Sequence, residues 1–313
     1  MKKPHILFIS TRDDLTTDYL AVKAEAKNIP YVRINSEDLF ESKFIFTPEQ
    51  PIRVQHKKMY YDFDSIKGVI FRRAPSVFPD DLQNEDAPFL NRERREFLEG
   101  LFLGLHAKWI NPIHNTYVGE RKVWQLKLAY ELGLLVPKTI ITNELAKAKK
   151  FQDTIKNVIV KPISHGLQVT KDATYSIYTS TLNKIEENAE SEIFSSPILI
   201  QENIIRGLDI RVTIIGERVF PVAIYKNNIH TIDWRRPEIK KTYKKHTISQ
   251  DLTNKLLELN KKMGLIYSAI DLIQDENGQV FFLETNPAGE WLWLEKEIGL
   301  PLSDSFLIEI QND

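Results

Sequence analysis

The sequence predicts an α/β protein that is divided into several subdomains. Its first part alternates strand-like apolar runs with an amphipathic helix, over residues 5–9, 14–28 and 31–34, which is typical of a parallel sheet. Its last part joins strand-like runs through tight turns, which indicates antiparallel hairpins. A chain of 313 residues is too long for one small core, so we expect two or three subdomains.

The composition excludes several classes of protein. The chain has no cysteine, which rules out disulfides, thiolate catalysis and zinc–thiolate sites. Its net charge of −1 argues against nucleic acid as the main partner. The N-terminal segment lacks the apolar core of a signal peptide, and no apolar run reaches the ~18 residues that a membrane helix needs. We therefore expect a cytoplasmic protein without a membrane partner.

An N-terminal α/β domain is expected over residues 1–111. Short edge strands, a helix and a proline-ended linker are predicted within it at 44–46, 52–54, 58–61, 88–107 and 109–112. A buried strand over 68–75 ends in Arg72 and Arg73. Ligands of open α/β sheets bind at the carboxyl ends of strands, so these arginines are candidates for a cleft. The alternative is a solvated strand end.

A central α+β subdomain is expected over residues 112–195, and a C-terminal subdomain over 196–313. In the central part we predict two helices, two strands, a hairpin and a polar helix, at 120–132, 142–151, 138–141, 157–162, 168–178 and 182–190. In the C-terminal part we predict a strand, two hairpins and three helices, at 197–202, 209–225, 267–283, 249–263, from 292 and from 303.

Three hard oxygen donors lie close together in the last predicted hairpin. Asp271 follows its first strand, and Glu284 and Asn286 follow its second strand. Residues two apart on a strand point the same way, so these donors should share one face. Such a set suits Mg²⁺, which usually takes one or two carboxylates together with substrate phosphates. The alternative is a polar strand end followed by a turn.

Lysine and small residues indicate a phosphate site in the central subdomain. Lys161 ends a buried strand and precedes the loop Ser164-His165-Gly166, so ammonium and backbone N–H groups can meet phosphates there. Lys122, near the start of a predicted helix, would supply a second cation. Lys161 is otherwise a strand lysine that extends its ammonium to water. His165 contacts a phosphate or a peptide, or is a loop residue bonded to backbone.

Other polar residues complete a nucleotide site. Backbone groups at a strand end are candidates for contact with a base edge, at Gln201, Glu202 and Ile204. Asp209 is a candidate for a ribose hydroxyl, and Arg211 and Arg235 for the transferred phosphoryl group. Phosphoryl transfer requires this kind of positioning and charge neutralisation. Arg235 and Arg236 are alternatively a solvated pair in a loop.

Taken in chain order, these residues resemble the ATP-grasp ligases. Within that superfamily the chain is most similar to the graspetide synthetases, which mature microviridin-type and plesiocin-type peptides. The motifs that carry this resemblance are Phe71-Arg-Arg-Ala-Pro75, Gln201-Glu-Asn with Leu208-Asp-Ile-Arg211, Asp233-Trp-Arg235 and Glu284-Thr-Asn-Pro-Ala-Gly-Glu-Trp291. The resemblance implies an ATP-grasp fold, with the nucleotide between the central and the C-terminal antiparallel-sheet subdomains.

The resemblance also implies a mechanism that uses ATP and Mg²⁺. A carboxylate attacks the γ-phosphate, ADP leaves, and a hydroxyl or amine attacks the acyl phosphate. In graspetides the carboxylates are Asp or Glu side chains of a ribosomal precursor peptide with a leader and a core, and the nucleophiles are its Ser, Thr or Lys side chains. The products are macrocyclic esters or amides. Arg211 and Arg235 are then catalytic, and four residues contact the peptide, namely Arg72, Arg73, His165 and Arg236.

Two other functions are compatible with the same motifs. One is a carboxylate–amine ligase that adds an amino acid to a peptide or metabolite. The other is an ATP-binding module without turnover. The sequence leaves the precursor, the linkage and a homodimer open.

Overall fold

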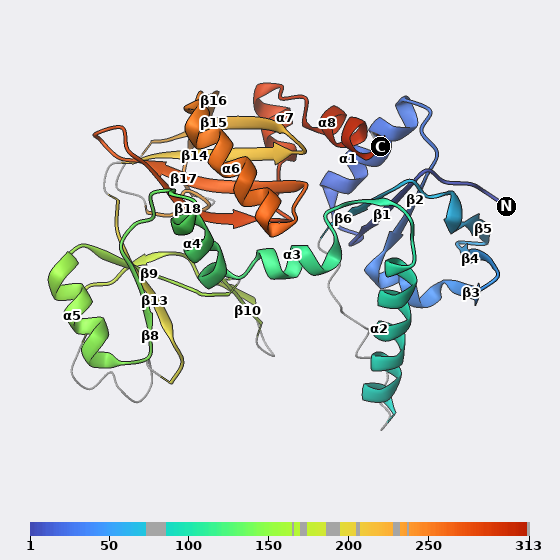
Figure 1. Ribbon diagram of the computed structural model, residues 1–313, viewed down its shortest axis with the longest axis horizontal. Coiled ribbons are helices and arrows are strands. Elements are labelled where there is room, and N and C mark those ends of the chain that lie inside the picture. The colour runs from blue at the N-terminus through green and yellow to red at the C-terminus, as the bar shows by residue number, and fades with distance from the viewer. Residues whose placement is uncertain are drawn as a thin grey trace. The chain divides into compact units, whose positions relative to one another are not determined.

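The computed structural model forms two compact units (Figure 1). It describes residues 1–72, 86–164, 166–169, 174–185, 195–204, 207–227, 232–236 and 238–311. The first unit contains Met1–Thr116, Gly264–Tyr267 and Ala288–Asp313, and the second contains Tyr117–Met263 and Ser268–Pro287. The expected division into 1–111, 112–195 and 196–313 stays a prediction. The structure adds that the C-terminal segment returns to the first unit.

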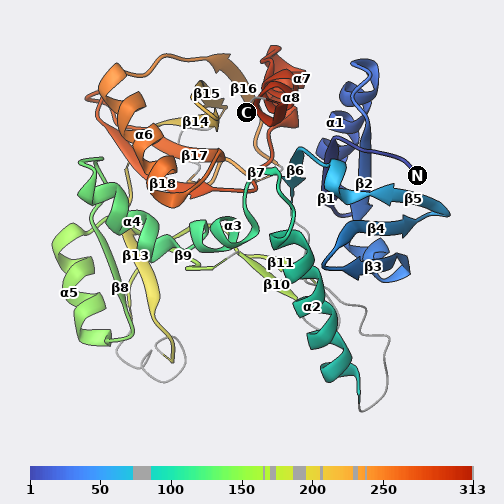
Figure 2. The same ribbon diagram turned by 45° about the vertical axis from the view of Figure 1, so that its right-hand side comes forward.

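A parallel four-stranded sheet organises the first unit, as the opening of the sequence predicts. Its order is β2 (Tyr31–Asn35), β1 (Ile6–Ser10), β6 (Gly68–Phe71) and β7 (Lys108–Ile110). The linker prediction at 109–112 is wrong at its start, because Lys108–Ile110 pairs with β6 as a strand (Figure 2). Ile110 is buried, and three residues are too few for a period to reveal a strand in sequence.

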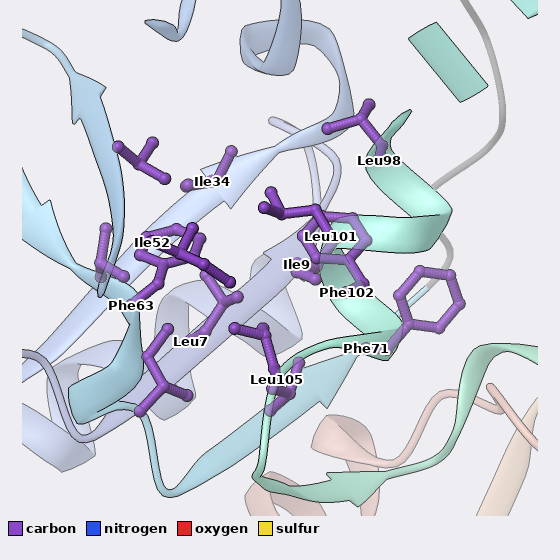
Figure 3. Close-up of a cluster of buried hydrophobic side chains, with 14 residues drawn as sticks. Leu7, Ile9, Ile34, Ile52, Phe63, Phe71, Leu98, Leu101, Phe102 and Leu105 are labelled. Atoms are coloured by element: carbon purple, nitrogen blue, oxygen red, sulfur yellow. The ribbon is translucent and has the colours of Figure 1, made fainter. Parts of the chain in front are cut away.

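Helices and a small antiparallel sheet enclose the core of this unit. The helices are α1 (Leu15–Ala26), α2 (Ala87–Leu103), α7 (Leu292–Ile298) and α8 (Leu302–Gln311), and the sheet consists of β3 (Lys43–Thr47), β4 (Gln50–His56) and β5 (Met59–Asp62). Side chains spaced by three and four residues, at Leu98, Leu101 and Phe102, pack against Leu7 and Ile9 (Figure 3). The predicted stripe on this helix is wrong at Phe89 and Phe97, which are exposed.

The second unit contains two larger sheets. The first has the order β12 (Ser180–Thr181), β9 (Val158–Lys161), β13 (Ile198–Glu202) and β8 (Thr139–Thr142). The second has the order β16 (Lys241–Lys245), β15 (Arg218–Lys226), β14 (Leu208–Ile215), β17 (Tyr267–Gln274) and β18 (Val280–Asn286). The short hairpin of β10 (Leu167–Val169) and β11 (Thr174–Ser176) confirms the pairing predicted at 168–178. The antiparallel pairing predicted for the C-terminal part is also confirmed.

Helices of the second unit follow the sequence with three corrections. They are α4 (Lys122–Glu131), α5 (Leu145–Ile155) and α6 (Gln250–Met263), and α3 (Ile113–Gly119), which was not predicted, leads into this unit. Helix α5 begins after Glu144 rather than at 142–143, although Thr142 Oγ1 still accepts a hydrogen bond from the Glu144 backbone. Residues 182–185 are not helical, and the rest of the helix predicted at 182–190 lies outside the described residues.

Membrane insertion was examined on the helices alone. Within the described part of the chain, none has the length and apolar character that a membrane span requires.

A buried ion pair holds the end of β6 in the first unit. Arg72 is 2% exposed, and its Nε lies 3.1 Å from Asp14 Oδ2 while its Nη2 lies 2.8 Å from Glu290 Oε1. Its Nη1 donates to the carbonyl of Gly289 at 3.2 Å. Asp14 also caps α1 by accepting from two backbone N–H groups. This arginine therefore joins the N-terminal and C-terminal segments of one unit.

The charge of Asp14 is expected to make this unit sensitive to acid. Burial alone would raise the pKa of Asp14, but Arg72 and the hydroxyls of Ser10 and Thr17 lower it from 3.8 to about 2. A carboxyl with a lowered pKa stabilises the fold above its ordinary pKa, and this contribution is lost as the pH falls through the lowered value. The lost free energy of unfolding is about 2 kcal/mol.

Asp14→Asn keeps the cap but removes the charge. We expect the wild-type free energy of unfolding, measured by urea titration, to fall more steeply than that of Asp14→Asn between pH 3.8 and about 2. Equal slopes for the two proteins would contradict this assignment.

Candidate nucleotide and metal site

The hairpin of β17 and β18 brings two carboxylates opposite each other. Asp271 is the register partner of Glu284, and Asn286 is the partner of Ala269. Opposite residues of an antiparallel pair share a face, as do residues two apart on one strand. The three oxygen donors therefore lie on one face, as the sequence predicts.

A turn and a β-bulge together set this register. Asp275 Oδ1 accepts hydrogen bonds from the backbone of Asn277 at 2.9 Å and Gln279 at 2.7 Å. The register then shifts by one residue between Asp271 and Leu272. Without that shift Asp271 would be opposite Leu283, so the extra residue of the bulge places Glu284 there instead.

Three cationic side chains surround the carboxylate pair. Arg211 Nη1 lies 3.0 Å from Asp271 Oδ1. Lys122 Nζ lies 3.4 Å from Glu284 Oε2, and Arg235 Nη1 lies 3.5 Å from Glu284 Oε1. Each cation comes from a different element, so the cluster exists only in the folded unit.

The two carboxyl groups respond differently to this environment. Burial raises the pKa of Asp271, Arg211 opposes the shift, and the nearby charge of Glu284 adds to it, giving about 6. Burial also acts on Glu284, but Lys122, Arg235 and Lys161 outweigh it and lower the pKa. Additional positive charge near Asp271 would stabilise its ionised form.

A cavity of about 560 Å³ lies within the second unit, next to these carboxylates. Small-molecule sites occupy roughly 300–1,000 Å³, so a nucleotide-sized ligand fits this volume. Ten of the residues that the sequence predicts for the site line the cavity, namely Lys122, Lys161, Gln201, Glu202, Ile204, Asp209, Arg235, Asp271, Glu284 and Asn286. Residues far apart in the sequence thus meet around one space.

Lys161 ends strand β9 in the wall of the cavity. Burial lowers the pKa of its ammonium, while the charge of Glu284 favours the protonated form. Among the described residues, no hydrogen bond or ion pair engages this ammonium. A buried cation without a protein partner is suited to an anionic ligand.

Arg235 is held in a fixed orientation by Asp233. Its Nε donates to Asp233 Oδ1 at 2.9 Å, and its Nη2 donates to Asp233 Oδ2 at 2.8 Å. Burial would raise the pKa of Asp233, but the hydrogen bond and charge of Arg235 lower it. This two-bond contact orients the guanidinium toward Glu284.

Arg211 reaches the site through Asp271 and is itself buried. Its guanidinium carbon lies 5.6 Å from the ring centre of Trp234. Trp234 lines the cavity, so an aromatic face lies between this arginine and the ligand space. The catalytic roles expected for Arg211 and Arg235 stay predictions.

The residues expected around the base and ribose already have partners. Gln201 Nε2 donates to Thr139 Oγ1 at 2.8 Å, whereas its Oε1 is buried without a partner among the described residues. Glu202 Oε2 accepts from the backbone of Lys138 at 3.2 Å. Asp209 Oδ2 pairs with Lys226 Nζ at 2.6 Å, and burial raises the Asp209 pKa. Ile204 lines the cavity.

The structure separates the residues expected to contact a peptide. Arg73 and His165 lie outside the described residues. Arg72 belongs to the first unit, where its ion pairs favour a structural role over a peptide contact. Arg236 lies 5.0 Å from the ring centre of Tyr178 and 3.6 Å from Glu238.

Sequence reasoning missed a buried glutamine that holds β18. Gln125, on α4, donates to the carbonyls of Thr285 at 2.8 Å and Gly119 at 2.6 Å. Its Oε1 accepts from the Thr285 backbone at 3.1 Å. Thr285 separates Glu284 from Asn286, so Gln125 fixes the strand segment that carries both donors. The only sequence signal was its spacing of three residues from Lys122 on one helix.

Family comparison assigns this arrangement to a known class. The model of the RimK-like ATP-grasp domain matches residues 120–310, which is more than half of the chain. The chain therefore belongs to the RimK-like ATP-grasp family, and the expected ATP-grasp fold is confirmed. Ligases of this family use ATP and Mg²⁺.

Individual relatives differ in their substrates. The tetrahydromethanopterin:alpha-L-glutamate ligase of Methanocaldococcus jannaschii is 26% identical over 183 residues, which cover 56% of this chain and 60% of that protein. The chain thus spans about 60% of the length of that relative.

Solved structures match almost the whole chain. Macrocyclase MdnC of Microcystis aeruginosa MRC, bound with precursor peptide MdnA, has a TM-score of 0.84 and 27% identity, and the match covers 97% of this chain and 98% of MdnC. The RiPP-associated ATP-grasp ligase of Chryseobacterium gregarium, in complex with ADP and a leader and core peptide, also has a TM-score of 0.84, with 20% identity over 98% of this chain and 96% of that one. The second match shows the fold alone.

We expect Gln125→Leu to weaken the site without unfolding the unit. Removing a partner that orients a metal-binding segment typically costs about 10–100-fold in metal affinity or activity. The measurement is the Mg²⁺ concentration that gives half-maximal ATP turnover, together with the melting temperature.

Gln152→Leu is the matched control, because Gln152 is also buried and also bonds backbone carbonyls, at Leu182 and Asn183. It does not line the cavity. An equal change in Mg²⁺ dependence in both variants would contradict the special role of Gln125.

Proposed function

We propose that this chain is an ATP-dependent peptide ligase that joins Asp or Glu side chains of a ribosomal precursor peptide to its Ser, Thr or Lys side chains. The products would be macrocyclic esters or amides. The observation that carries the proposal is the cavity in which Lys122, Lys161 and Arg235 meet the carboxylates of Asp271 and Glu284. The similarity to MdnC over almost the whole chain supports a peptide substrate.

Nucleotide binding would use the two lysines and the strand end. Lys161 and Lys122 supply positive charge to phosphates, and backbone groups at Gln201–Ile204 meet the edge of the base. Asp209 uses Oδ2 for Lys226, so Oδ1 is the atom offered to a ribose hydroxyl. These contacts position the triphosphate over the carboxylate pair.

The donor set fits Mg²⁺. In the described ranges, no three His, Cys, Asp or Glu side chains group as metal ligands. Asp271, Glu284 and the Asn286 amide offer two carboxylates and one neutral oxygen, which suits an ion that completes its shell with phosphates and water. When bound, Mg²⁺ neutralises charge on the phosphate oxygens.

The chemistry has two balanced steps. A peptide carboxylate oxygen attacks the γ-phosphorus, the bond from that phosphorus to the β-bridging oxygen breaks, and ADP leaves. A hydroxyl or amine then attacks the acyl carbon, phosphate leaves with the bonding electrons, and the nucleophile loses its proton. Two anions approach each other in the first step, so guanidinium groups on the path are expected, and Arg235 and Arg211 are the candidates.

A carboxylate–amine ligase is the second candidate function. The glutamate ligase of Methanocaldococcus jannaschii, at 26% identity, favours it. Both functions share activation of a carboxylate by ATP, so only the acceptor separates them.

Mass spectrometry tests the proposal directly. The purified protein is incubated with Mg²⁺, ATP and the acidic, Thr-rich peptides encoded beside its gene, and ADP release is followed in parallel. We expect each linkage to remove the mass of one water from the peptide. A gain in mass by an added amino acid would instead support the second function. Nucleotide binding without ADP release would indicate a module without turnover.

We expect Glu284→Gln and Asp271→Asn each to reduce ATP turnover by at least about 100-fold while the fold persists. Each change removes a charge from the donor set at nearly constant volume. Glu276→Gln is the matched control, because it is the same kind of change in the exposed turn of the same hairpin. Peptide-dependent ADP release and circular dichroism are the measurements. Wild-type turnover in Glu284→Gln would refute the metal assignment.

We expect Arg235→Lys to lose peptide dehydration while nucleotide binding remains. Lysine keeps the charge but not the two-bond contact with Asp233, so the cation is no longer fixed. Arg236→Lys, one residue along, serves as the control. Isothermal titration with ADP and peptide mass spectrometry separate the two effects. Normal dehydration by Arg235→Lys would show that orientation by Asp233 is unnecessary.

A further inference from the structure

The edge strand β16 belongs to a strongly basic segment. Residues 232–246 contain six Lys or Arg and two Asp or Glu side chains, a local net charge of +4 in a chain whose net charge is −1. Strand β16 forms the outer edge of the five-stranded sheet. This concentration of charge is not used by the nucleotide site described above.

The strand register assigns these lysines to different faces. Lys245 is opposite Val222, and Val222 is opposite Arg211, so the three residues share a face. Asp209, two residues from Arg211, is on that face and lines the cavity. Lys244 points the other way, where its ammonium lies 5.4 Å from the ring centre of Tyr225.

Trp234 connects the cavity to this basic edge. Its ring centre lies 5.6 Å from the guanidinium carbon of Arg211 and 5.7 Å from Lys241 Nζ. Lys241 is four residues before Lys245 on the same strand, so both side chains share the cavity face. With strands spaced by about 4.8 Å, the backbones at Arg211 and Lys245 are about 10 Å apart.

Protection of a sheet edge is the simplest alternative explanation. Lysines on edge strands hinder pairing with other chains, whichever face they occupy. That role does not require lysines in line with the cavity, yet Lys241 and Lys245 lie there. Lys245 is exposed and has no acidic partner among the described residues.

We propose that Lys241 and Lys245 form an approach track for the acidic segment of the substrate peptide. The track holds carboxylates that are not yet reacting, next to the arginines that receive the reacting one. Charge complementarity with Asp and Glu side chains and continuity with the cavity through Trp234 select this occupant. The inference rests on the proposed function, because it assumes a peptide substrate.

Binding of a fluorescein-labelled hexaglutamate peptide, measured by anisotropy with Mg²⁺ and ADP present, tests the track. Lys245→Glu and Lys244→Glu change the net charge equally, on opposite faces of one strand. We expect Lys245→Glu to weaken binding about tenfold at low salt, and Lys244→Glu to have a much smaller effect, with the difference shrinking as salt is added. Equal melting temperatures confirm that both variants are folded.

Three results would overturn the track. They are equal losses in the two variants, no binding of hexaglutamate by the wild type, and equally tight binding of a short oligothymidylate with the same dependence on Lys245.

The outcome is separable from the ligase proposal. If the Lys245-dependent binding is found but no peptide is modified, the ligase chemistry is wrong and the track stands. If a precursor is modified with an unchanged KM in Lys245→Glu, the track is wrong and the ligase chemistry stands.

Discussion

The structure of the site depends on one strand register, the pairing of β17 with β18 through a bulge. This register places Asp271 opposite Glu284, although like charges directly opposite each other are destabilising. The second unit offsets that repulsion with Arg211, Lys122 and Arg235. Removing one member of such a buried cluster commonly costs about 3–5 kcal/mol, because its partner stays charged and buried. The folding of this unit and the assembly of the site are therefore the same event.

Each cation is held by a different device, and the devices fit the proposed roles. Arg235 is fixed by two hydrogen bonds from Asp233, which suits a group that must meet a transferred phosphate in one orientation. Lys161 has no such partner among the described residues, which suits a cation whose partner is the ligand. Lys122 bonds the carbonyl of Pro162 at 2.8 Å while it pairs with Glu284, so it links the end of β9 to the metal donors.

The sequence predicted the site better than it predicted the local folding around it. Asp271, Glu284 and Asn286 were recognisable because alternation and an Asn-Gly turn define a hairpin locally. The bulge was not recognisable, because nothing local distinguishes Leu283 as the unpaired residue. The β7 strand was missed for a related reason, since three residues carry no period. Asp233 and Gln125 act through contacts with residues far away in the sequence, and pattern reasoning does not reach those.

The motif that runs from Glu284 to Trp291 serves two purposes, and the structure separates them. Its first three residues end β18 in the second unit, whereas Gly289, Glu290 and Trp291 are packed in the first. There Gly289 and Glu290 bind Arg72, and Trp291 stacks on Phe306 at 5.1 Å between ring centres. The Phe71–Pro75 and Glu284–Trp291 motifs thus meet inside one unit through Arg72. A buried arginine with two carboxylate partners is explained by packing, and no substrate is needed to account for it.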